Sequence, residues 1–217
     1  GECLLTSART AELVKLSENA YRDVNIAFAN ELSLVCEELN IDVWEAIRLA
    51  NHHPRVDILN PGPGVGGHCI AVDPWFLVDS APKQTPLIKA ARFVNDGKPI
   101  SIARGVLKDA SQLGVTNIAC LGLSYKADID DLRESPSVDV VVELMKDKRH
   151  TLWIVEPHSV KLPKNLQNIG TVKLSSLDDA LAKCDIIVLL TDHQVFKDIS
   201  TANYPSKRFI DTRGLWK

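Results

Sequence analysis

The first part of the chain carries apolar residues at the three- and four-residue spacing of an amphipathic helix. Residues 8–39 contain no Pro or Gly, and their apolar positions are Leu13, Leu16, Ala20, Val24, Ala27, Phe28, Leu32, Val35 and Leu39. The spacing predicts one helix of about 30 residues, roughly 45 Å long. Because its apolar stripe needs cover, we expect it to pack along a partner helix or a second subunit.

Two more stretches of the first half have helical patterns. The segment IDVWEAIRLAN predicts a short helix, and residues 86–113 predict one helix, or two helices broken at Gly97 to Pro99. Between them lies a loop rich in Pro and Gly, PGPGVGGHCIAVDP at 61–74. We therefore expect an all-α domain over residues 1–115.

From residue 116 the pattern changes to short apolar runs that alternate with helical segments. Strands are predicted at NIACLGL, TLWIVEP, DIIVLLTD and RFIDTRG, and helices at SPSVDVVVELMKD and SLDDALAKC. The first of these helices has Ser135 at its N-cap and Pro136 at its first position. Alternating strands and helices predict a parallel sheet with crossover helices. We therefore expect a Rossmann-like α/β domain over residues 116–217.

Composition and charge exclude several classes of function. Hydrophobic residues make up 45% of the 217 and charged residues 24%, which is ordinary for a globular protein. No apolar run approaches the roughly 20 residues that cross a bilayer, so we expect no membrane span. The net charge of -3 gives no electrostatic reason to expect nucleic acid. Five scattered cysteines without zinc spacing predict a reducing compartment, the cytoplasm, and no metal site.

The loop at 61–74 joins a cysteine to closely spaced glycines. Glycine allows a backbone to approach a ligand closely, and Cys69 follows the last glycine after one residue. A thiol is a nucleophile when its pKa is lowered. The alternative is a structural cysteine in an irregular turn. Asp73 follows four residues later, where it orders water near the sulfur, caps the helix expected from Pro74, or does both.

Polar residues elsewhere extend the candidate chemistry. Lys15 and Asn19 are four residues apart, so they share a helix face at the edge of the apolar stripe. The alternative is that both are simply solvated. The segment LGLSYKADIDDLRESPS has only Gly122 and lacks the three-glycine dinucleotide fingerprint, which argues against an NAD site there. With Lys126 and Arg133 before a helix start, it is either an anion site or a solvated charged loop.

Four motifs occur in the order and spacing of the UDP-glucose/GDP-mannose dehydrogenase family: AELVKLSENAYRDVNIAFANELS, GPGVGGHCIAVDP, LGLSYKADIDDLRESPS and FIDTRG. The likeness covers almost the whole chain, which resembles the family's central helical dimerisation domain and carboxy-terminal UDP-sugar-binding domain. Members begin with an NAD-binding Rossmann domain that has no counterpart here. The chain also starts without Met, so we expect a piece of a longer protein that is inactive alone.

The resemblance implies a reaction. Such enzymes oxidise the C6 alcohol of a nucleotide sugar to a carboxylate with two NAD+, and the cysteine of G-G-x-C, here Cys69, is the nucleophile. It would form a thiohemiacetal and then a thioester. Lys15 would stabilise oxyanion charge or transfer protons, Asn19 would hold the same oxygen or a water, and Asp73 would activate water and orient the lysine. His68 before the cysteine resembles the branch specific for N-acetylhexosamines.

The resemblance implies binding roles as well. Tyr125 and Lys126 match a pair that contacts the nucleotide sugar, and Arg213 matches a substrate-binding arginine. Arg133 matches an arginine that reaches toward NAD, and Arg55 one that reaches the substrate across a homodimer formed by the long helix. Loop backbone amides would line the sugar nucleotide at Gly62, Gly64, Val65, Gly66 and Gly67.

Several alternatives remain open. Overall likeness favours the UDP derivative of N-acetylmannosamine as substrate, giving a uronate for surface polysaccharide synthesis, and the alternatives are those of N-acetylglucosamine and glucose. A different class would be a cysteine acyltransferase or hydrolase. That class needs a base at the thiol, and the adjacent His68 rarely gives triad geometry. The last alternative is an inert dimerisation module.

Overall fold

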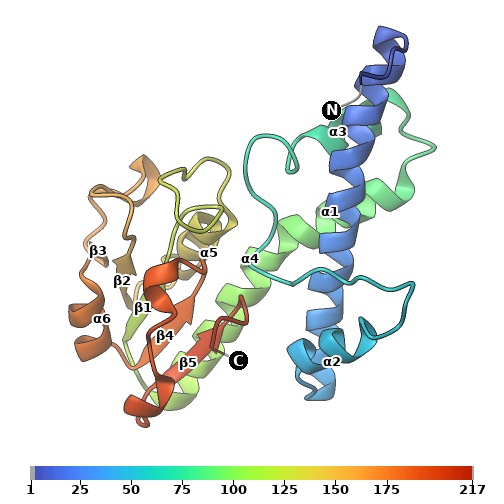
Figure 1. Ribbon diagram of the computed structural model, residues 1–217. Helices are drawn as coiled ribbons and strands as arrows, with labels where there is room; N and C mark the ends of the chain where they lie inside the picture. The colour runs from blue at the N-terminus through green and yellow to red at the C-terminus, as the bar shows by residue number, and fades with distance from the viewer. Residues whose placement is uncertain (1–2, 217) are drawn as a thin grey trace.

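Two long helices dominate the helical part of the molecule, and the second of them continues into an α/β part (Figure 1). The computed structural model describes residues 3–216. The helices are α1 (Ala8–Leu39), α2 (Val43–Ala50), α3 (Asp73–Ser80), α4 (Pro86–Leu113), α5 (Pro136–Leu144) and α6 (Leu177–Lys183). The strands are β1 (Asn117–Leu121), β2 (Thr151–Val155), β3 (Val172–Leu174), β4 (Ile186–Leu189) and β5 (Arg208–Asp211).

Helix α1 has the bounds that the apolar spacing predicts, because no residue in it interrupts the backbone hydrogen bonds. The Ser7 side chain caps its start by accepting the N–H of Thr10 at 3.2 Å. Asn40 ends it in the left-handed conformation, with φ of 56°. None of the helices that the structure describes has the length and apolar character needed to cross a membrane.

Helix α4 is continuous, so the break considered at Gly97 to Pro99 does not occur. Pro99 lies inside the helix and has no N–H to donate to the carbonyl of Asn95. Packing on both sides maintains the helix across this missing bond. Its first half lies against α1, and its second half contributes Ala103, Val106 and Ala110 to the core of the α/β part. The domain boundary at residue 115 stays a prediction.

The sheet is wholly parallel, in the order β3-β2-β1-β4-β5. This confirms the predicted α/β class. Ile118 of β1 aligns with Leu152 of β2 on one side and with Ile186 of β4 on the other. Strand β3 was not predicted, because it is three residues long and its two last residues are exposed. The chain order reverses direction between β1 and β4, where ligands bind in open sheets of this class.

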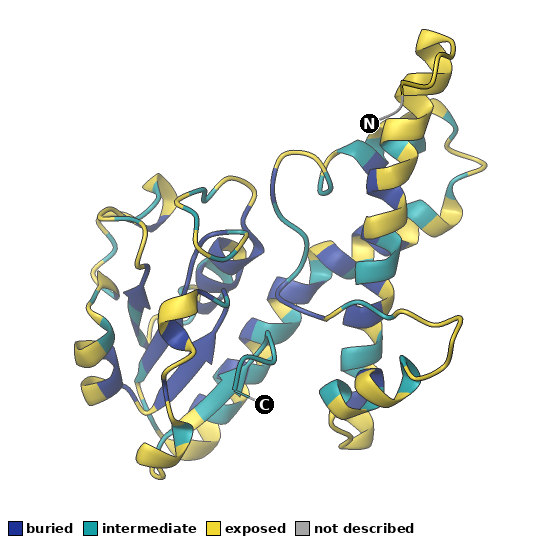
Figure 2. Cartoon of the chain, viewed as in Figure 1, coloured by how far each residue is buried: buried dark blue, intermediate teal, exposed yellow. Residues whose placement is uncertain are grey.

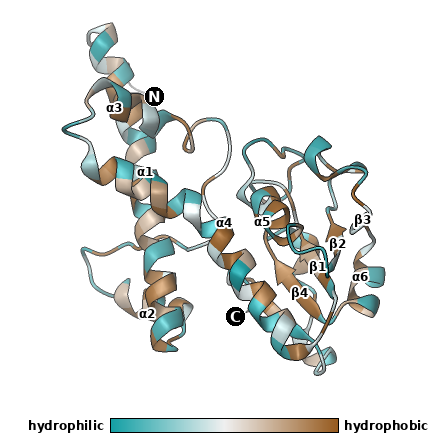
Figure 3. Ribbon diagram, turned by 180° about the vertical axis from the view of Figure 1, so that it is seen from behind, coloured by the Kyte–Doolittle hydropathy of each residue, from teal (hydrophilic) through white to brown (hydrophobic). Residues whose placement is uncertain are grey.

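Apolar residues on the two faces of the sheet form separate cores, which gives three layers. Ile118 and Cys120 face α4 and α5, whereas Ala119 and Leu121 face α6 and Phe196. Figure 2 shows the central strands as buried, and Figure 3 shows β1, β4 and α5 as hydrophobic. Helix α4 is therefore shared by the two parts of the molecule.

Two helix starts bear on the predictions. Ser135 at the N-cap and Pro136 at the first position of α5 are confirmed, although the Ser135 hydroxyl donates to the Leu123 carbonyl at 2.6 Å and makes no capping hydrogen bond. Asp73 is the first residue of α3, after Val72 at the N-cap, so a capping role for Asp73 is wrong. Both side chains are directed to partners outside their own helix.

Candidate active site at the glycine-rich loop

The glycine-rich loop passes between the helical part and the α/β part. A Cβ added at Gly66 would lie 2.6 Å from Tyr125 Cβ and from the Glu134 carbonyl oxygen. Gly67 has φ of 82°, and a Cβ there would lie 3.0 Å from the Tyr125 ring. These glycines are therefore required by contact with the segment after β1. The binding of a sugar nucleotide by the backbone amides of this loop, including that of Val65, stays a prediction.

The loop brings Cys69 close to Asp73 within one helical turn. The Cys69 carbonyl accepts the N–H of Val72 at 3.0 Å and of Asp73 at 2.8 Å. Cys69 itself is exposed. The predicted nucleophile and acid therefore lie one turn apart in sequence, Cys69 in the turn before α3 and Asp73 at its first residue.

Asn19 joins this cluster from helix α1. Its side-chain amide donates to Asp73 Oδ2 at 2.6 Å, and only 4% of Asn19 is exposed. A solvated Asn19, one of the alternatives from the sequence, is therefore wrong. Lys15, one turn earlier, is exposed and pairs with Glu18 at 3.4 Å. Asp73 accepts its hydrogen bond from Asn19, whereas Lys15 pairs with Glu18. That Asp73 orients Lys15 therefore stays a prediction.

Arg213 reaches the loop from the end of β5. Its guanidinium lies against Gly62, where an added Cβ would contact Nη1 directly. Its Nε donates to Asp192 at 2.9 Å, and it is about one-third exposed. The structure thus brings Arg213 to Gly62 at the start of the glycine-rich loop, although the two are far apart in sequence.

The segment after β1 carries the other predicted binding residues. Tyr125 packs on the loop at Gly67, and Lys126 is exposed. Arg133 is also exposed and binds both carboxylate oxygens of Asp131 through Nε and Nη2, at distances of 2.5–3.1 Å. These hydrogen bonds lower the pKa of Asp131 to about 2, with a contribution from His68. Arg133 therefore favours the ionised form of this carboxylate.

Arg55 is set apart from this cluster. It lies on the exposed loop after α2, where its backbone N–H donates to His53 Nδ1 at 3.2 Å. It makes no hydrogen bond or ion pair with another predicted site residue in the described part of the chain. Its role across a dimer stays a prediction.

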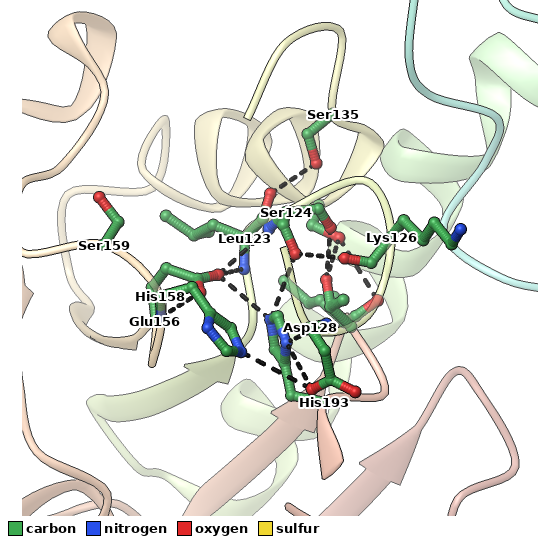
Figure 4. A network of polar contacts seen from close by, with 12 residues as sticks. Leu123, Ser124, Lys126, Asp128, Ser135, Glu156, His158, Ser159 and His193 are labelled. Carbon is green, nitrogen blue, oxygen red and sulfur yellow. Dashed lines mark hydrogen bonds and ion pairs between the residues drawn. The ribbon is translucent and has the colours of Figure 1, made fainter. Parts of the chain in front are cut away.

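Glu156, which follows β2, occupies the place where a dinucleotide domain binds pyrophosphate. Glu156 Oε2 accepts the N–H groups of Leu123 (2.6 Å) and Ser124 (3.1 Å), directly after β1 (Figure 4). In dinucleotide-binding sheets such N–H groups face the ligand. Burial raises the pKa of Glu156, but hydrogen bonds from His193 and Leu123 more than offset this and lower it overall. The α/β part therefore does not fit NAD at this loop.

Three groups that can ligate metals meet beside Glu156, which sequence spacing did not reveal. Asp128, His158 and His193 place ligand atoms within 4.8 Å of one another. However, His193 Nδ1 accepts the Asp128 N–H at 2.9 Å, so its proton is on Nε2, which faces Ser124 at 3.2 Å. Both ring nitrogens of His193 are thus used within the protein. Figure 4 shows Lys126 pointing away from this network.

A cavity of about 260 Å³ lies between α1, α4 and β5, beside the start of the loop. Its walls include Gly62, Thr212 and Lys98. Lys98 is buried and donates to Ser33 at 2.6 Å. Sequence reasoning missed Lys98, because one lysine next to Pro99 in a helix carries no signal of burial.

Comparisons with known proteins agree on one family. Residues 9–97 match the UDP-glucose/GDP-mannose dehydrogenase family, central domain, and residues 119–217 match the UDP binding domain of the same family. The chain is 54% identical over its whole length to an NDP-N-acetyl-D-galactosaminuronic acid dehydrogenase of Ralstonia nicotianae, covering 50% of that protein. It is 50% identical to the UDP-N-acetyl-D-mannosamine dehydrogenase of Yersinia pestis, covering all of the chain and 53% of that protein.

Solved structures give the same result. The UDP-D-ManNAc dehydrogenase of Pyrococcus horikoshii superposes on the whole chain with a TM-score of 0.85 and 38% identity, over 51% of that structure. The UDP-N-acetyl-mannosamine dehydrogenase Cap5O of Staphylococcus aureus gives a TM-score of 0.84 over 50% of its length. The chain thus spans about half the length of the relatives it matches.

Proposed function

The chain belongs to the UDP-glucose/GDP-mannose dehydrogenase family, and from this premise we propose that it supplies the nucleophile and the UDP-sugar site of a nucleotide-sugar 6-dehydrogenase. The observation that carries the proposal is the convergence of Cys69, Asp73 and Asn19 at the start of α3. Cys69 is exposed there, which a nucleophile requires.

The proposed chemistry proceeds in two oxidations. The C6 alcohol is oxidised to an aldehyde, and the Cys69 sulfur adds to its carbonyl carbon to give a thiohemiacetal. Loss of a hydride from that carbon leaves a thioester, which water cleaves to the carboxylate and free thiol. NAD+ supplies the hydride acceptor in each oxidation. The covalent bond to sulfur retains the intermediate between them.

Asp73 and Asn19 have distinct tasks in this scheme. The Asp73 carboxylate accepts a proton from the water that attacks the thioester. Asn19 holds that carboxylate in place by donating to Oδ2, which leaves Oδ1 for the water. Lys15 stabilises the oxyanion that develops on the former carbonyl oxygen.

The UDP-sugar is proposed to bind where the α/β part meets the loop. Arg213, at Gly62, offers a guanidinium suited to a diphosphate. Tyr125 and Lys126 contribute an aromatic face and a second cation. Gly62, Gly64, Val65, Gly66 and Gly67 provide backbone amides. Arg133 is proposed to reach the NAD.

NAD is proposed to bind mainly outside these 217 residues, and the chain alone to be inactive. The N–H groups after β1 are already bound to Glu156, so the α/β part offers no free pyrophosphate site there. The relatives are about twice as long as the chain, so their remaining half has room for the cofactor.

We propose that the chain forms a homodimer through the side of α1 that faces away from α4. Exposed apolar residues recur there every seven positions, at Val14, Tyr21, Phe28 and Val35. Such a repeat covers itself by packing against a second helix. A mass measured by light scattering that stays monomeric at high concentration would contradict the dimer and the role of Arg55 across it.

For the substrate we propose UDP-N-acetyl-D-mannosamine, with a second candidate from the comparisons. The Ralstonia relative, named for N-acetyl-D-galactosaminuronic acid, favours UDP-N-acetyl-galactosamine. Initial rates of NADH formation with these two sugars, UDP-N-acetylglucosamine and UDP-glucose would rank them. Equal rates with all four would contradict a preference for N-acetylhexosamines.

Calorimetry of UDP on the chain tests the binding site without catalysis. We expect a dissociation constant of about 1 mM or tighter, and Arg213→Ala to weaken it at least about tenfold. Arg104→Ala, an exposed change on α4, is the matched control. Absence of binding at several millimolar UDP would contradict the proposed site.

A further inference from the structure

A buried chain of side-chain amides links helix α1 to the start of the glycine-rich loop. Asn30 Oδ1 accepts the N–H of Gly62 at 2.9 Å, and Asn30 Nδ2 donates to Asn95 Oδ1 at 2.9 Å. Asn95 Nδ2 donates to Asp23 Oδ1 at 2.8 Å and to its carbonyl at 3.0 Å. Asn30, Asn95 and Asp23 are each at most 2% exposed.

The two ends of this chain fix its direction. The N–H of Gly62 can only donate, and the Asp23 carboxylate can only accept. Asn30 must therefore present its oxygen to Gly62 and its nitrogen to Asn95, and Asn95 must present its nitrogen to Asp23. Reversal of either amide would set oxygen against oxygen in a dry interior, where an unpaired polar group is costly.

Arg92 secures the far end of the chain. Its Nη1 donates to Asp23 Oδ1 at 2.6 Å, and its Nη2 pairs with Asp96. Burial raises the pKa of the Asp23 carboxyl, and Arg92 and Asn95 oppose that shift. The carboxylate thus depends on the donors that the amide chain brings to it.

The backbone of Asn95 provides a second contact with the loop. Pro99 leaves the Asn95 carbonyl without its helical donor. Gly64 lies against this oxygen, because a Cβ added at Gly64 would be 3.0 Å from it. The side chain and the carbonyl of Asn95 therefore both support the first residues of the loop.

Helix α1 holds the loop segment at two points. Asn30 binds its start at Gly62, and Asn19 binds its end at Asp73. Asn19 and Asn30 are 11 positions apart, about three helical turns, so they lie on one face of α1. Cys69 lies in the segment between these two points.

We infer that Asn30 and Asn95 are positioning residues, which fix the Cys69 segment relative to helix α1 through the directional chain from Asp23 to Gly62. The inference rests on the proposed function only in its consequence for catalysis. The fixing of the loop is a property of the folded chain and can be measured without substrate.

Hydrogen exchange of the loop amides, followed by mass spectrometry on the full chain, tests the inference. Asn30→Asp keeps an oxygen that accepts the N–H of Gly62, but its second oxygen then faces the side-chain oxygen of Asn95. If the Asn95 amide reverses to relieve this contact, its oxygen faces the Asp23 carboxylate instead. We expect loop amides between residues 62 and 69 to exchange at least about tenfold faster. Asn25→Asp is the matched control, because the Asn25 side chain donates to the Tyr21 carbonyl of its own helix and is not part of the amide chain.

A second substitution reverses the chain and separates positioning from general damage. In Asp23→Asn with Asn30→Asp, the new amide donates to Asn95, and the new carboxylate accepts from Asn95 and Gly62. Asp23→Asn alone also removes the carboxylate that pairs with the buried Arg92, so it is the reference for the double variant, and we expect loop exchange in the double variant to stay within about threefold of Asp23→Asn. Loop exchange within about twofold of the unsubstituted chain for Asn30→Asp, or a further acceleration of about tenfold when Asn30→Asp is added to Asp23→Asn, would overturn the inference.

Folding and catalysis are checked separately. Should Asn30→Asp not fold, Asn30→Ala carries the same expectation, because it removes the Gly62 acceptor and Ala favours a helix. Unchanged loop exchange in Asn30→Ala would overturn the inference. NADH formation by the complete enzyme is measured in parallel. NADH formation by the Cys69→Ala enzyme at the unsubstituted rate would refute the proposed function and would leave the exchange result unaffected.

Discussion

Asn19 donates a hydrogen bond of 2.6 Å to Asp73, which lies 54 positions later in the chain. The bond connects the middle of helix α1 to the first residue of α3. Cys69 lies one turn before Asp73, and its carbonyl accepts the Asp73 N–H, so the bond from Asn19 holds the turn that carries the exposed thiol. This relationship is the basis of the proposed chemistry.

Asp73→Asn is expected to abolish most thioester hydrolysis while leaving the fold intact. The amide keeps the shape of the side chain but cannot accept the proton of water. We expect the rate of NADH formation by the complete enzyme to fall roughly 10²–10⁴-fold. Asp79→Asn, on the exposed side of α3, is the control. A loss of less than about tenfold for Asp73→Asn would refute its role as base.

Gly66→Ala is expected to destabilise the chain by about 1–3 kcal/mol, because the new methyl would overlap Tyr125 and the Glu134 carbonyl. Gly97→Ala is the matched control, since a Cβ at Gly97 meets nothing within 4 Å. That change should stabilise helix α4 by about 0.5–1 kcal/mol. Urea unfolding measures both changes. Equal effects would show that the loop does not pack as described.

Lys98 is expected to make the free energy of unfolding rise between pH 8 and pH 10. Burial lowers the pKa of Lys98 from 10.5 to about 8, with partial opposition from Glu37. In this window the unfolded chain binds a proton that the folded chain has released, so stability increases with pH. Below pH 8 both states are protonated and the cost of the buried charge is greatest.

Lys98→Met should remove this rise, which amounts to at most about 3 kcal/mol. Lys108→Met, at an exposed position of the same helix, is the control. Chemical denaturation at a series of pH values gives both curves. The same pH slope in the Lys98 variant and the unsubstituted chain would contradict the buried ammonium.

Alkylation of the folded chain is expected to modify two of the five cysteines. Cys3 and Cys69 are exposed, whereas Cys36, Cys120 and Cys184 are buried. Burial also raises the pKa of Cys184 to about 12 and that of Cys120 further still, so few thiolates form. Mass spectrometry after iodoacetamide should find the buried three modified only in denaturant. Early modification of Cys120 would contradict the described core.

Much of the fold follows from local pattern. The apolar period gave helix α1 with its observed bounds, and alternating strands and helices gave the parallel sheet, because both depend on neighbours in sequence. Continuity of α4 through Pro99 was not decidable locally. It depends on packing against α1 and the sheet, which offsets one missing hydrogen bond.

The site was predicted unevenly for the same reason. Cys69 and the glycines stand out in sequence, but Asn30 and Asn95 do not, because a buried amide and a solvated one have the same letter. Their partners are 32 and 72 positions away. The steric need for Gly66 likewise comes from Tyr125, which only the fold brings near. Long-range contacts of this kind carry no periodic signal.

In the proposed mechanism, Cys69 carries the intermediate of a two-step oxidation. The most direct measurement is NADH formation by the complete enzyme with a UDP-N-acetylhexosamine, in the unsubstituted form and as Cys69→Ala, with Cys3→Ser as the control thiol change. We expect two NADH per sugar oxidised in the unsubstituted enzyme and in Cys3→Ser, and no uronate from Cys69→Ala. Formation of the uronate by Cys69→Ala at the unsubstituted rate would contradict this mechanism.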